Sequence, residues 1–502
     1  MNPALFDRKL EEAREFLRTF DLGHALAAYQ KLAQQHPQKS EIWFEYGCAA
    51  CGAGQMDLAE RAWSKAIELE PRNTKLLLDI GHNCRGARQV EMAQEWFKKA
   101  AALEPRGINP RMALAILHEQ EHRFPEAREA VASCLAIDPR DDQARYYEAF
   151  LDRRENKLDD AERRLRDLIA SNPQHQYVRY ASRYELAEVL NRTERYDEAM
   201  QQLLEAKATV RSCGPDIGEM LAKYQAEAES DRRASQQQPK DILRKWAKEF
   251  PAKSREGMPP LTFLGGHPRS GTTLLEQIVG AHPGVASLDE PAVFLTTIRL
   301  MFRDSPLLSP ARLNVLRRRY FESIRKEWGG SLEGKLVVDK NPSPTAKLPT
   351  WLRIFPELKV LIALRDPRDV VISCFFQNLV LTQANANFLS LERTARHYAD
   401  LMDVWLAVRQ WEGLAWTETK YEDIVADLEK EGRRVTEFLG LTWDPAQAKF
   451  YEKSRQRKIY APTYRDASQP VYRRAVARWH CYEKHLAPIL PVLEPYCRAL
   501  GY

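Results

Sequence analysis

Residues 265–273 of this chain, Gly-Gly-His-Pro-Arg-Ser-Gly-Thr-Thr, place an arginine and hydroxyl side chains in a glycine-rich turn. The apolar run 261–264 precedes the turn and the run 274–279 follows it, which predicts a strand, a turn and a helix. Such a turn directs several backbone N–H groups at one point, at the positive end of a helix dipole, where a phosphate fits. The predicted contacts are the Arg269 guanidinium and the amides or hydroxyls of Ser270, Gly271, Thr272 and Thr273.

The spacing of this turn is close to that of the phosphate-binding loop of nucleoside triphosphatases, G-x-x-x-x-G-K-[ST]. Gly266 and Gly271 occupy the two glycine positions, but Thr272 stands where those enzymes carry a lysine. That lysine reaches the β- and γ-phosphates, so its absence favours a nucleotide without a reactive γ-phosphate. The same absence argues against a kinase that uses a nucleoside triphosphate.

A second group of residues predicts a second phosphate site. The run 359–364, Lys-Val-Leu-Ile-Ala-Leu, is typical of a buried strand, and Arg365 follows it at the carboxyl end, where open α/β sheets bind ligands. Pro367 suits the first turn of a helix, and Ser373 comes about two turns later. Arg365 alone would indicate only a surface ion pair. Two phosphate sites in one α/β domain indicate a nucleotide with a 5′ phosphate chain and a separate 3′ phosphate.

The segments Pro-Arg-Ser-Gly-Thr-Thr (268–273) and Arg-Asp-Pro-Arg-Asp-Val-Val-Ile-Ser (365–373) resemble the 5′- and 3′-phosphate loops of sulfotransferases that use PAPS, 3′-phosphoadenosine 5′-phosphosulfate. The resemblance covers roughly residues 258–502 and is greatest to tyrosylprotein sulfotransferases and to bacterial sulfotransferases fused to tetratricopeptide repeats. It implies a P-loop-like α/β domain with a parallel sheet, PAPS as the co-substrate, and no metal. The alternative from another class is a nucleotide-binding scaffold without turnover.

The resemblance also implies roles for single residues. Arg269 would stabilise the leaving phosphate, and Lys340, in Asp-Lys-Asn-Pro (339–342), the bridging oxygen. Arg365 and Ser373 would hold the 3′ phosphate. Further nucleotide contacts are implied for positions nearer the C-terminus, namely Tyr421, Thr463 and Arg478.

Transfer to a hydroxyl group needs a general base. Glu290 lies 21 residues after Arg269, which is the spacing of the catalytic glutamate in tyrosylprotein sulfotransferases, and it is the predicted base. His282 is the alternative, because small-molecule sulfotransferases use a histidine, but its Ala-His-Pro context is typical of a turn. Gln377 stands where the tyrosylprotein enzymes carry a further arginine. We expect a hydroxyl acceptor, with peptide tyrosine favoured and a carbohydrate or small molecule as the alternative.

The first half of the chain repeats every 34 residues. Three sets of residues recur with this period: Pro37, Pro71, Pro105, Pro139 and Pro173; Ala25, Ala59, Ala93, Ala127 and Ala161; Tyr29, Trp63, Phe97, Val131 and Leu165. A further small position recurs 12 residues before an alanine: Gly47, Gly81, Ala115 and Ala149. Two helices per repeat, ended by a proline, are typical of tetratricopeptide repeats. We predict an all-α solenoid of about six repeats, the sixth displaced by four residues near Ala199, that either recruits a peptide or protein partner or serves as a scaffold.

The predicted fold class is therefore α plus α/β, with the solenoid at 1–213, a helical connector at 214–257 and the sulfotransferase domain at 258–502. A net charge of +5 in 502 residues suits an anionic cofactor and gives no reason to expect nucleic acid. The sequence has neither a run of 18 apolar residues nor an apolar leader after Met1, so no membrane span and no export are predicted. The eight cysteines are scattered, which indicates a reducing compartment, and we predict a cytoplasmic enzyme of open oligomeric state.

Overall fold

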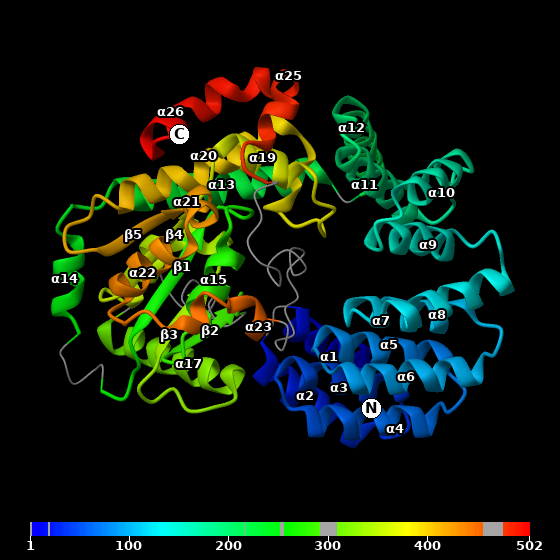
Figure 1. Ribbon diagram of the computed structural model, residues 1–502. Helices are drawn as coiled ribbons and strands as arrows, with labels where there is room; N and C mark the ends of the chain where they lie inside the picture. Colours follow the sequence, from blue (N-terminus) through cyan, green and yellow to red (C-terminus); the bar gives the residue numbers. More distant parts are fainter. Residues whose placement is uncertain (1–2, 19–20, 215, 251–255, 292–308, 455–474) are drawn as a thin grey trace. The chain divides into compact units, whose positions relative to one another are not determined.

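The structure is a computed structural model, and it describes residues 3–18, 21–214, 216–250, 256–291, 309–454 and 475–502. The chain divides into two compact units, Met1–Thr193 and Glu194–Tyr502 (Figure 1). The first unit is built of helices, and the second is built around a parallel sheet. The predicted fold class, helical repeats followed by an α/β domain with a parallel sheet, is confirmed. Within the described ranges, no helix combines the length and the apolar character that a membrane span requires.

Each helix of the first unit packs on the next helix along the chain. Their bounds are α1 (Pro3–Arg18), α2 (Leu22–Gln35), α3 (Ser40–Gly52), α4 (Met56–Leu69), α5 (Thr74–Gly86), α6 (Val90–Leu103), α7 (Ile108–Gln120), α8 (Phe124–Ile137), α9 (Asp142–Arg154), α10 (Leu158–Ala170) and α11 (Gln176–Arg192). The side chains of Asp21, Asn73 and Asp141 each accept a hydrogen bond from a backbone N–H in the first turn of the helix that follows. These caps satisfy donors that the helix itself leaves without a partner.

The turn between the two helices of a repeat contains a residue in the left-handed backbone region. Its φ is 66° at Gly54, 63° at Arg88, 57° at His122 and 65° at Asn156, so the conformation recurs every 34 residues. The corresponding residue between α11 and α12 is Glu194, with φ of 59°, which comes four residues later than the period would place it. The backbone therefore shows the same displacement that the sequence pattern predicts for the sixth repeat.

The recurring small position makes room for the recurring large side chain. A Cβ atom added to Gly47 would lie 2.3 Å from the Trp63 ring, and one added to Gly81 would lie 2.4 Å from the Phe97 ring. In the following repeat the corresponding pair is Ala115 and Val131, and both belong to one buried cluster. A larger residue on one helix is thus matched by a smaller one on its neighbour, which keeps the packing close.

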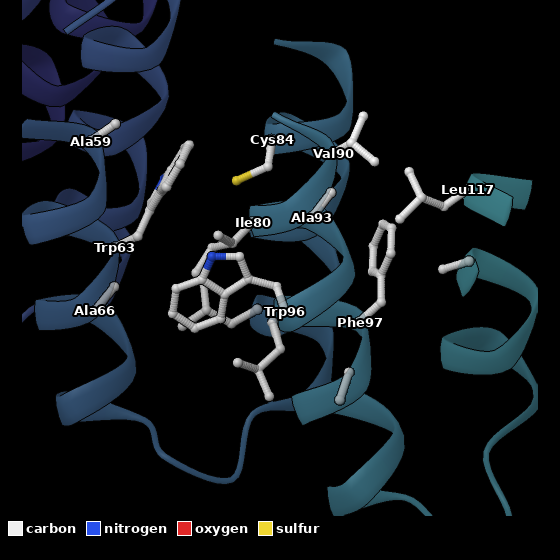
Figure 2. Close-up of a cluster of buried hydrophobic side chains, with 14 of the residues drawn as sticks. Ala59, Trp63, Ala66, Ile80, Cys84, Val90, Ala93, Trp96, Phe97 and Leu117 are labelled. Atoms are coloured by element: carbon white, nitrogen blue, oxygen red, sulfur yellow. The ribbon is translucent and has the colours of Figure 1, made fainter. Parts of the chain in front are cut away.

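Trp63 and Phe97 belong to a core that extends over several repeats (Figure 2). Cys84 lies in this core, and Cys48 and Cys51 pack against it. Burial raises the pKa of the Cys48 thiol and that of the Cys84 thiol to about 12. These cysteines therefore behave as small apolar residues of the core rather than as reactive thiols.

In the described part of the second unit, five strands form one parallel sheet in the order β2-β3-β1-β4-β5. Their bounds are β1 (Leu261–Gly266), β2 (Val285–Asp289), β3 (Leu336–Lys340), β4 (Lys359–Leu364) and β5 (Ala415–Lys420). Every residue of β1 and β3 is buried, including the charged Asp339 and Lys340 at the end of β3.

Helices precede, connect and follow these strands. Their bounds are α12 (Tyr196–Cys213), α13 (Ile217–Gln236), α14 (Ile242–Lys248), α15 (Thr272–Gly280), α17 (Pro310–Trp328), α18 (Leu348–Ile354), α19 (Pro367–Phe375), α20 (Leu391–Val408), α21 (Tyr421–Ala426), α22 (Leu428–Leu439), α23 (Phe450–Ser454), α25 (Glu483–Leu486) and α26 (Leu490–Leu500). Short 3-10 segments include η2 (Ser343–Lys347), η3 (Asn385–Leu389), η4 (Pro445–Gln447), η5 (Arg478–Tyr482) and η6 (Ala487–Ile489).

The helices α12 and α13 pack on the α/β part of the second unit. The ammonium of Lys207, in α12, is fully buried and lies 4.3 Å from the centroid of the Phe375 ring. The ring of Tyr224, in α13, stacks on His397 of α20 with centroids 5.1 Å apart. The segment before the first strand is therefore part of the body that carries the sheet.

Candidate active site

The predicted site residues follow strands that are neighbours in the sheet. Strands β2, β3, β1 and β4 lie side by side and run parallel, so their carboxyl ends share one edge. The candidates at these ends are, in sheet order, Glu290, Lys340, the glycine-rich turn 267–271 and Arg365. This is the edge at which parallel sheets bind ligands.

The glycine-rich turn after β1 is tight. Gly271 has φ of 88° and Arg269 has φ of 74°, both in the left-handed region. A Cβ atom on Gly266 would lie 2.3 Å from a carbonyl oxygen of β4, and one on Gly271 would lie 2.8 Å from the Tyr421 ring. The helix α15 begins at Thr272, directly after the turn. The N–H groups of its first turn, which have no carbonyl partner within the helix, therefore open onto the turn and give an anion a place to bind.

The structure brings the two predicted phosphate loops together. Arg269 donates a hydrogen bond from Nε to Ser373 Oγ at 3.1 Å, and Arg365 donates from Nη1 to the backbone oxygen of Arg269 at 3.3 Å. The Arg365 guanidinium also lies 5.1 Å from the centroid of the Tyr421 ring. Residues predicted from separate motifs thus form one cluster. Two arginines and a serine so placed can bind two phosphate groups of one ligand.

Two arginines near this edge have buried N–H groups that donate to no partner within the described residues: Arg365 at Nε, and Arg478 at Nε and Nη2. Arg365 is 6 % exposed, and its Nη2 donates to the backbone oxygen of Ala475. Arg478 begins η5, which packs on α19, and its guanidinium lies 4.1 Å from the centroid of the Phe376 ring. Buried donors are almost always satisfied in folded proteins. The oxygen atoms of an anionic ligand would satisfy these, so the residues present fit a nucleotide with phosphate groups.

Lys340 is a fully buried cation at the end of β3. Its side chain is 0 % exposed, and its Nζ forms ion pairs with Asp289 and with Glu290, the latter at 3.0 Å. Burial alone would lower the pKa of Lys340, but the neighbouring carboxylates of Asp289 and Glu290 outweigh burial and raise that pKa. The amine is therefore held in its charged form.

Glu290 follows β2 in the left-handed backbone region, with φ of 52°. Its N–H donates to the backbone oxygen of Lys340 at 2.8 Å, and its side chain is 56 % exposed. The alternative base, His282, precedes β2 and so lies at the amino end of that strand. Its ring nitrogens contact the oxygen of Thr442 at 3.0 Å and the N–H of Gly284 at 2.9 Å. The geometry favours Glu290, because only Glu290 lies at the edge that carries the other candidates.

The remaining predicted residues lie in or beside the same loops. Ser270 and Thr272 are buried, and Thr273 is half-buried in the first turn of α15. Gln377 donates from Nε2 to the backbone oxygen of Ser373 at 3.3 Å. Thr463 lies outside the described residues.

Three further residues support the site and were not predicted from the sequence. Asp289 pairs with Lys340, and its position at a strand end beside Glu290 could have suggested this. Thr345 Oγ1 accepts a hydrogen bond from the Gly266 N–H at 2.8 Å, although no sequence pattern connects the two. The Asp369 carboxylate accepts hydrogen bonds from the backbone N–H groups of residues 477 and 479, at 2.8 and 2.7 Å, and so ties the segment that carries Arg478 to α19.

Comparisons with known proteins agree with these observations. Residues 260–445 match the sulfotransferase family, and residues 148–212 match the tetratricopeptide repeat. An uncharacterized protein of Aquifex aeolicus (strain VF5) is 25 % identical over 326 residues, which are 62 % of this chain and 41 % of that protein. Protein-tyrosine sulfotransferase A of Caenorhabditis elegans is 25 % identical over 278 residues, which are 48 % of this chain and 67 % of that protein.

Among solved structures, the sulfotransferase domain from the Synechococcus PCC 7002 olefin synthase covers 44 % of this chain and 88 % of its own length, with 21 % identity and a TM-score of 0.32. The chain spans less than half of the Aquifex protein and about two thirds of the nematode protein. The matched range 260–445 contains the glycine-rich turn, Glu290, Lys340 and Arg365. The chain is therefore similar to the sulfotransferase family over residues 260–445 and to tetratricopeptide repeats over residues 148–212.

Proposed function

We propose that this protein transfers a sulfuryl group from PAPS to a hydroxyl group, and that tyrosine in a peptide is the acceptor. The observation that carries the proposal is the hydrogen bond from Arg269 to Ser373, which joins the two predicted phosphate loops. A nucleotide with phosphates on both its 5′ and 3′ carbons suits two adjacent loops of this kind. A nucleoside triphosphate has no 3′ phosphate with which to use the second loop.

Each part of the nucleotide has candidate partners at the sheet edge. The amides and hydroxyls of residues 270–273 would hold the 5′ phosphate at the N-terminus of α15. Arg365 and Ser373 would hold the 3′ phosphate, and the unsatisfied nitrogens of Arg365 and Arg478 supply further donors. Tyr421 would support the nucleotide beside Arg365.

PAPS supplies an activated sulfuryl group whose leaving group is a 5′ phosphate. Glu290 would accept the proton of the acceptor hydroxyl. Arg269 and Lys340 would stabilise the negative charge that develops on the leaving oxygen. Lys340 is preorganised for this role, because its buried position and its ion pairs fix the amine before any ligand binds. A scaffold without turnover would have no use for this arrangement of base and cations.

The acceptor is proposed from the relatives, since the nematode protein is named a protein-tyrosine sulfotransferase. The tetratricopeptide repeats would recruit the acceptor or a separate protein partner, because arrays of this kind offer an extended binding surface. No metal is needed for a phosphate leaving group. A cytoplasmic location stays a prediction from the sequence.

Nucleotide binding tests the cofactor. PAP, the desulfated product, should raise the melting temperature by mass action without added metal, and ATP should bind far less well. Arg365→Ala should weaken PAP binding by about one to two decades in calorimetry, because a charged hydrogen bond contributes roughly 1.5–3 kcal/mol. Arg396→Ala is the matched control, since this arginine forms an exposed ion pair with Glu392 of the same helix. Equal stabilisation by PAP and ATP would contradict the proposal.

Transfer of label tests the reaction and the acceptor. Wild-type protein with PAPS labelled in the sulfuryl group should label a tyrosine peptide but not the same peptide with phenylalanine in place of tyrosine. Label on carbohydrate or on a small hydroxyl compound, with none on peptides, would support PAPS as the cofactor but contradict peptide tyrosine as the acceptor. Absence of label on every acceptor in a lysate would contradict the catalytic proposal.

A further inference from the structure

Lys340 has two carboxylate partners, and the two are not equivalent. The Asp289 side chain is 21 % exposed, whereas the Glu290 side chain is 56 % exposed. Asp289 is the last residue of β2 and lies in register with Lys340 across the parallel pair β2–β3. Glu290 lies one residue beyond the strand. One partner is thus fixed by the sheet, and the other faces solvent.

This difference matters for a base that must become neutral. When Glu290 accepts a proton it loses its charge, and it no longer balances the Lys340 ammonium. A buried ammonium without a counter-charge is strongly unfavourable, so it would lose its proton or move. A second, permanent anion beside Lys340 removes this conflict.

We propose that Asp289 is a positioning residue that keeps Lys340 charged and in place while Glu290 exchanges its proton with the acceptor. The inference rests on the proposed function, since it assumes Glu290 as the base. It assigns the two adjacent carboxylates different tasks, with Asp289 as the lasting counter-charge and Glu290 as the exchanging group.

The other groups around Lys340 do not fill this role. On the other side of β3, Lys340 lies in register with the apolar Leu264 of β1. Its neighbour Asp339 is also buried, but the Asp339 carboxylate accepts a hydrogen bond from Tyr320 of α17 at 2.7 Å. The pKa of Asp339 is raised to about 7 by burial, so this carboxyl is not a dependable anion at neutral pH. Among the groups that the structure describes here, Asp289 is the less exposed of the two anions that pair with the amine.

The electrostatics of Lys340 give the proposal a measurable consequence. Burial lowers the pKa of this amine, whereas the carboxylates of Asp289 and Glu290 raise it. Asp289 contributes more to this rise than Glu290 does. Removing Asp289 should therefore lower the pKa of Lys340, and more than removing Glu290 does. An opposite charge at contact distance shifts a pKa by about one to three units.

The first experiment follows Lys340 directly in the full-length protein. The protein is labelled with ¹³C at lysine Cε, the Lys340 resonance is assigned from its loss in Lys340→Arg, and the titration midpoint is measured by NMR. Asp289→Asn should lower the midpoint by about one unit or more, Glu290→Gln should lower it less, and Asp289→Glu should restore it. An unchanged midpoint in a folded Asp289→Asn protein would overturn the proposal.

The second experiment measures the pH dependence of sulfuryl transfer, and it requires that the wild type is active. The high-pH limb of kcat/KM should move to lower pH in Asp289→Asn and return to its wild-type position in Asp289→Glu. A lower rate without a shift in the pH profile of kcat/KM would indicate a merely structural role and overturn the proposal. If Asp289→Asn does not fold, Asp289→Ser takes its place, and failure of both to fold counts against a role confined to positioning. A wild type without transfer activity would contradict the proposed function alone, because the NMR titration is read independently.

Discussion

At the scale of single residues, the candidate site combines unusual backbone conformations with charges that are held in place. Arg269 and Glu290 both have positive φ, although neither is glycine. Such conformations cost about 1–3 kcal/mol and persist where the surroundings enforce them. Here Ser373 holds the Arg269 side chain, and the backbone oxygen of Lys340 holds the Glu290 N–H. The Arg269 side chain and the Glu290 backbone are therefore held in place before a ligand binds.

Replacing the proposed base should separate chemistry from binding. Glu290→Gln should lower kcat by about 10²–10⁴ and leave PAP affinity close to that of the wild type, because the amide cannot accept the proton but fills the same space. Steady-state kinetics and calorimetry measure the two effects. His282→Ala is the control, since His282 lies at the other end of β2. Wild-type turnover in Glu290→Gln together with an inactive His282→Ala would contradict Glu290 as the base and assign that role to His282.

The buried Asp339 should make stability depend on pH. Burial raises its pKa to about 7, whereas an aspartate in an unfolded chain ionises near about 3.9. Folding therefore favours the protonated form, so this contribution to stability is complete below about pH 4 and is lost as the pH rises through about 7. Asp339→Asn cannot ionise and still offers Tyr320 an acceptor. The decline of the melting temperature between about pH 5 and 7 should be smaller in this variant, and an identical decline in both proteins would contradict the expectation.

At the scale of elements, the repeats show how close packing is kept while the sequence varies. Gly81 faces Phe97, and in the next repeat Ala115 shares a cluster with the smaller Val131. The 34-residue period can be read from the sequence because each repeat meets the same packing requirement. The reason for glycine at one repeat and alanine at the next becomes visible only when the facing side chain is known.

Gly81→Ala should destabilise the first unit, because its Cβ would lie 2.4 Å from the Phe97 ring. Overpacking of this kind costs typically about 1–3 kcal/mol, more than the gain in helix propensity. In a Phe97→Leu background the same change should cost nothing, so a double-mutant cycle in urea should give a coupling above about 1 kcal/mol. Gly23→Ala is the matched control, since nothing lies within 4 Å of the added atom, and it should be neutral or stabilising. Additive effects of the two substitutions would contradict this account.

The elements also show what the sequence could and could not predict. The strand, the glycine-rich turn and the helix around Arg269 follow from local patterns, and so does the strand before Arg365. The order of the strands, which brings β1 between β3 and β4, depends on contacts between distant segments. Thr345, which contacts Gly266 from 79 residues away, has for that reason no local signal. Asp289 was beside a predicted residue, but only the register of β2 with β3 shows its pairing with Lys340.

At the scale of the whole molecule, the repeat pattern extends beyond the boundary between the two compact units. The pattern continues through α12, whereas the compact units divide between Thr193 and Glu194. The helices α12 and α13 also reach the candidate site through packed side chains. Tyr224 stacks on His397, and His397 Nδ1 lies 2.8 Å from Nε2 of His267, the first residue of the glycine-rich turn. Burial lowers the pKa of His267 to about 4, so this ring is neutral and acts as packing.

Two truncations should therefore behave differently. A fragment of residues 194–502 should bind PAP as tightly as the full chain, because it keeps the whole second unit. A fragment of residues 254–502 should melt at lower temperature and bind PAP more weakly, since it loses the helices whose Lys207 and Tyr224 are packed against Phe375 and His397. Thermal unfolding with and without PAP measures both effects. Equal stability and affinity of the two fragments would show that α12 to α14 do not support the site.

The longer fragment also tests what the repeats contribute to turnover. If the repeats recruit a protein acceptor, the fragment of residues 194–502 should show a raised KM for that acceptor and an almost unchanged kcat. Binding energy from remote contacts that is equal in the ground state and the transition state affects KM and not kcat. A short tyrosine peptide that cannot reach the repeats is the control, and its KM should be the same for the fragment and the full chain. An unchanged KM for the protein acceptor in a well-folded fragment would instead assign the repeats to assembly or to another partner.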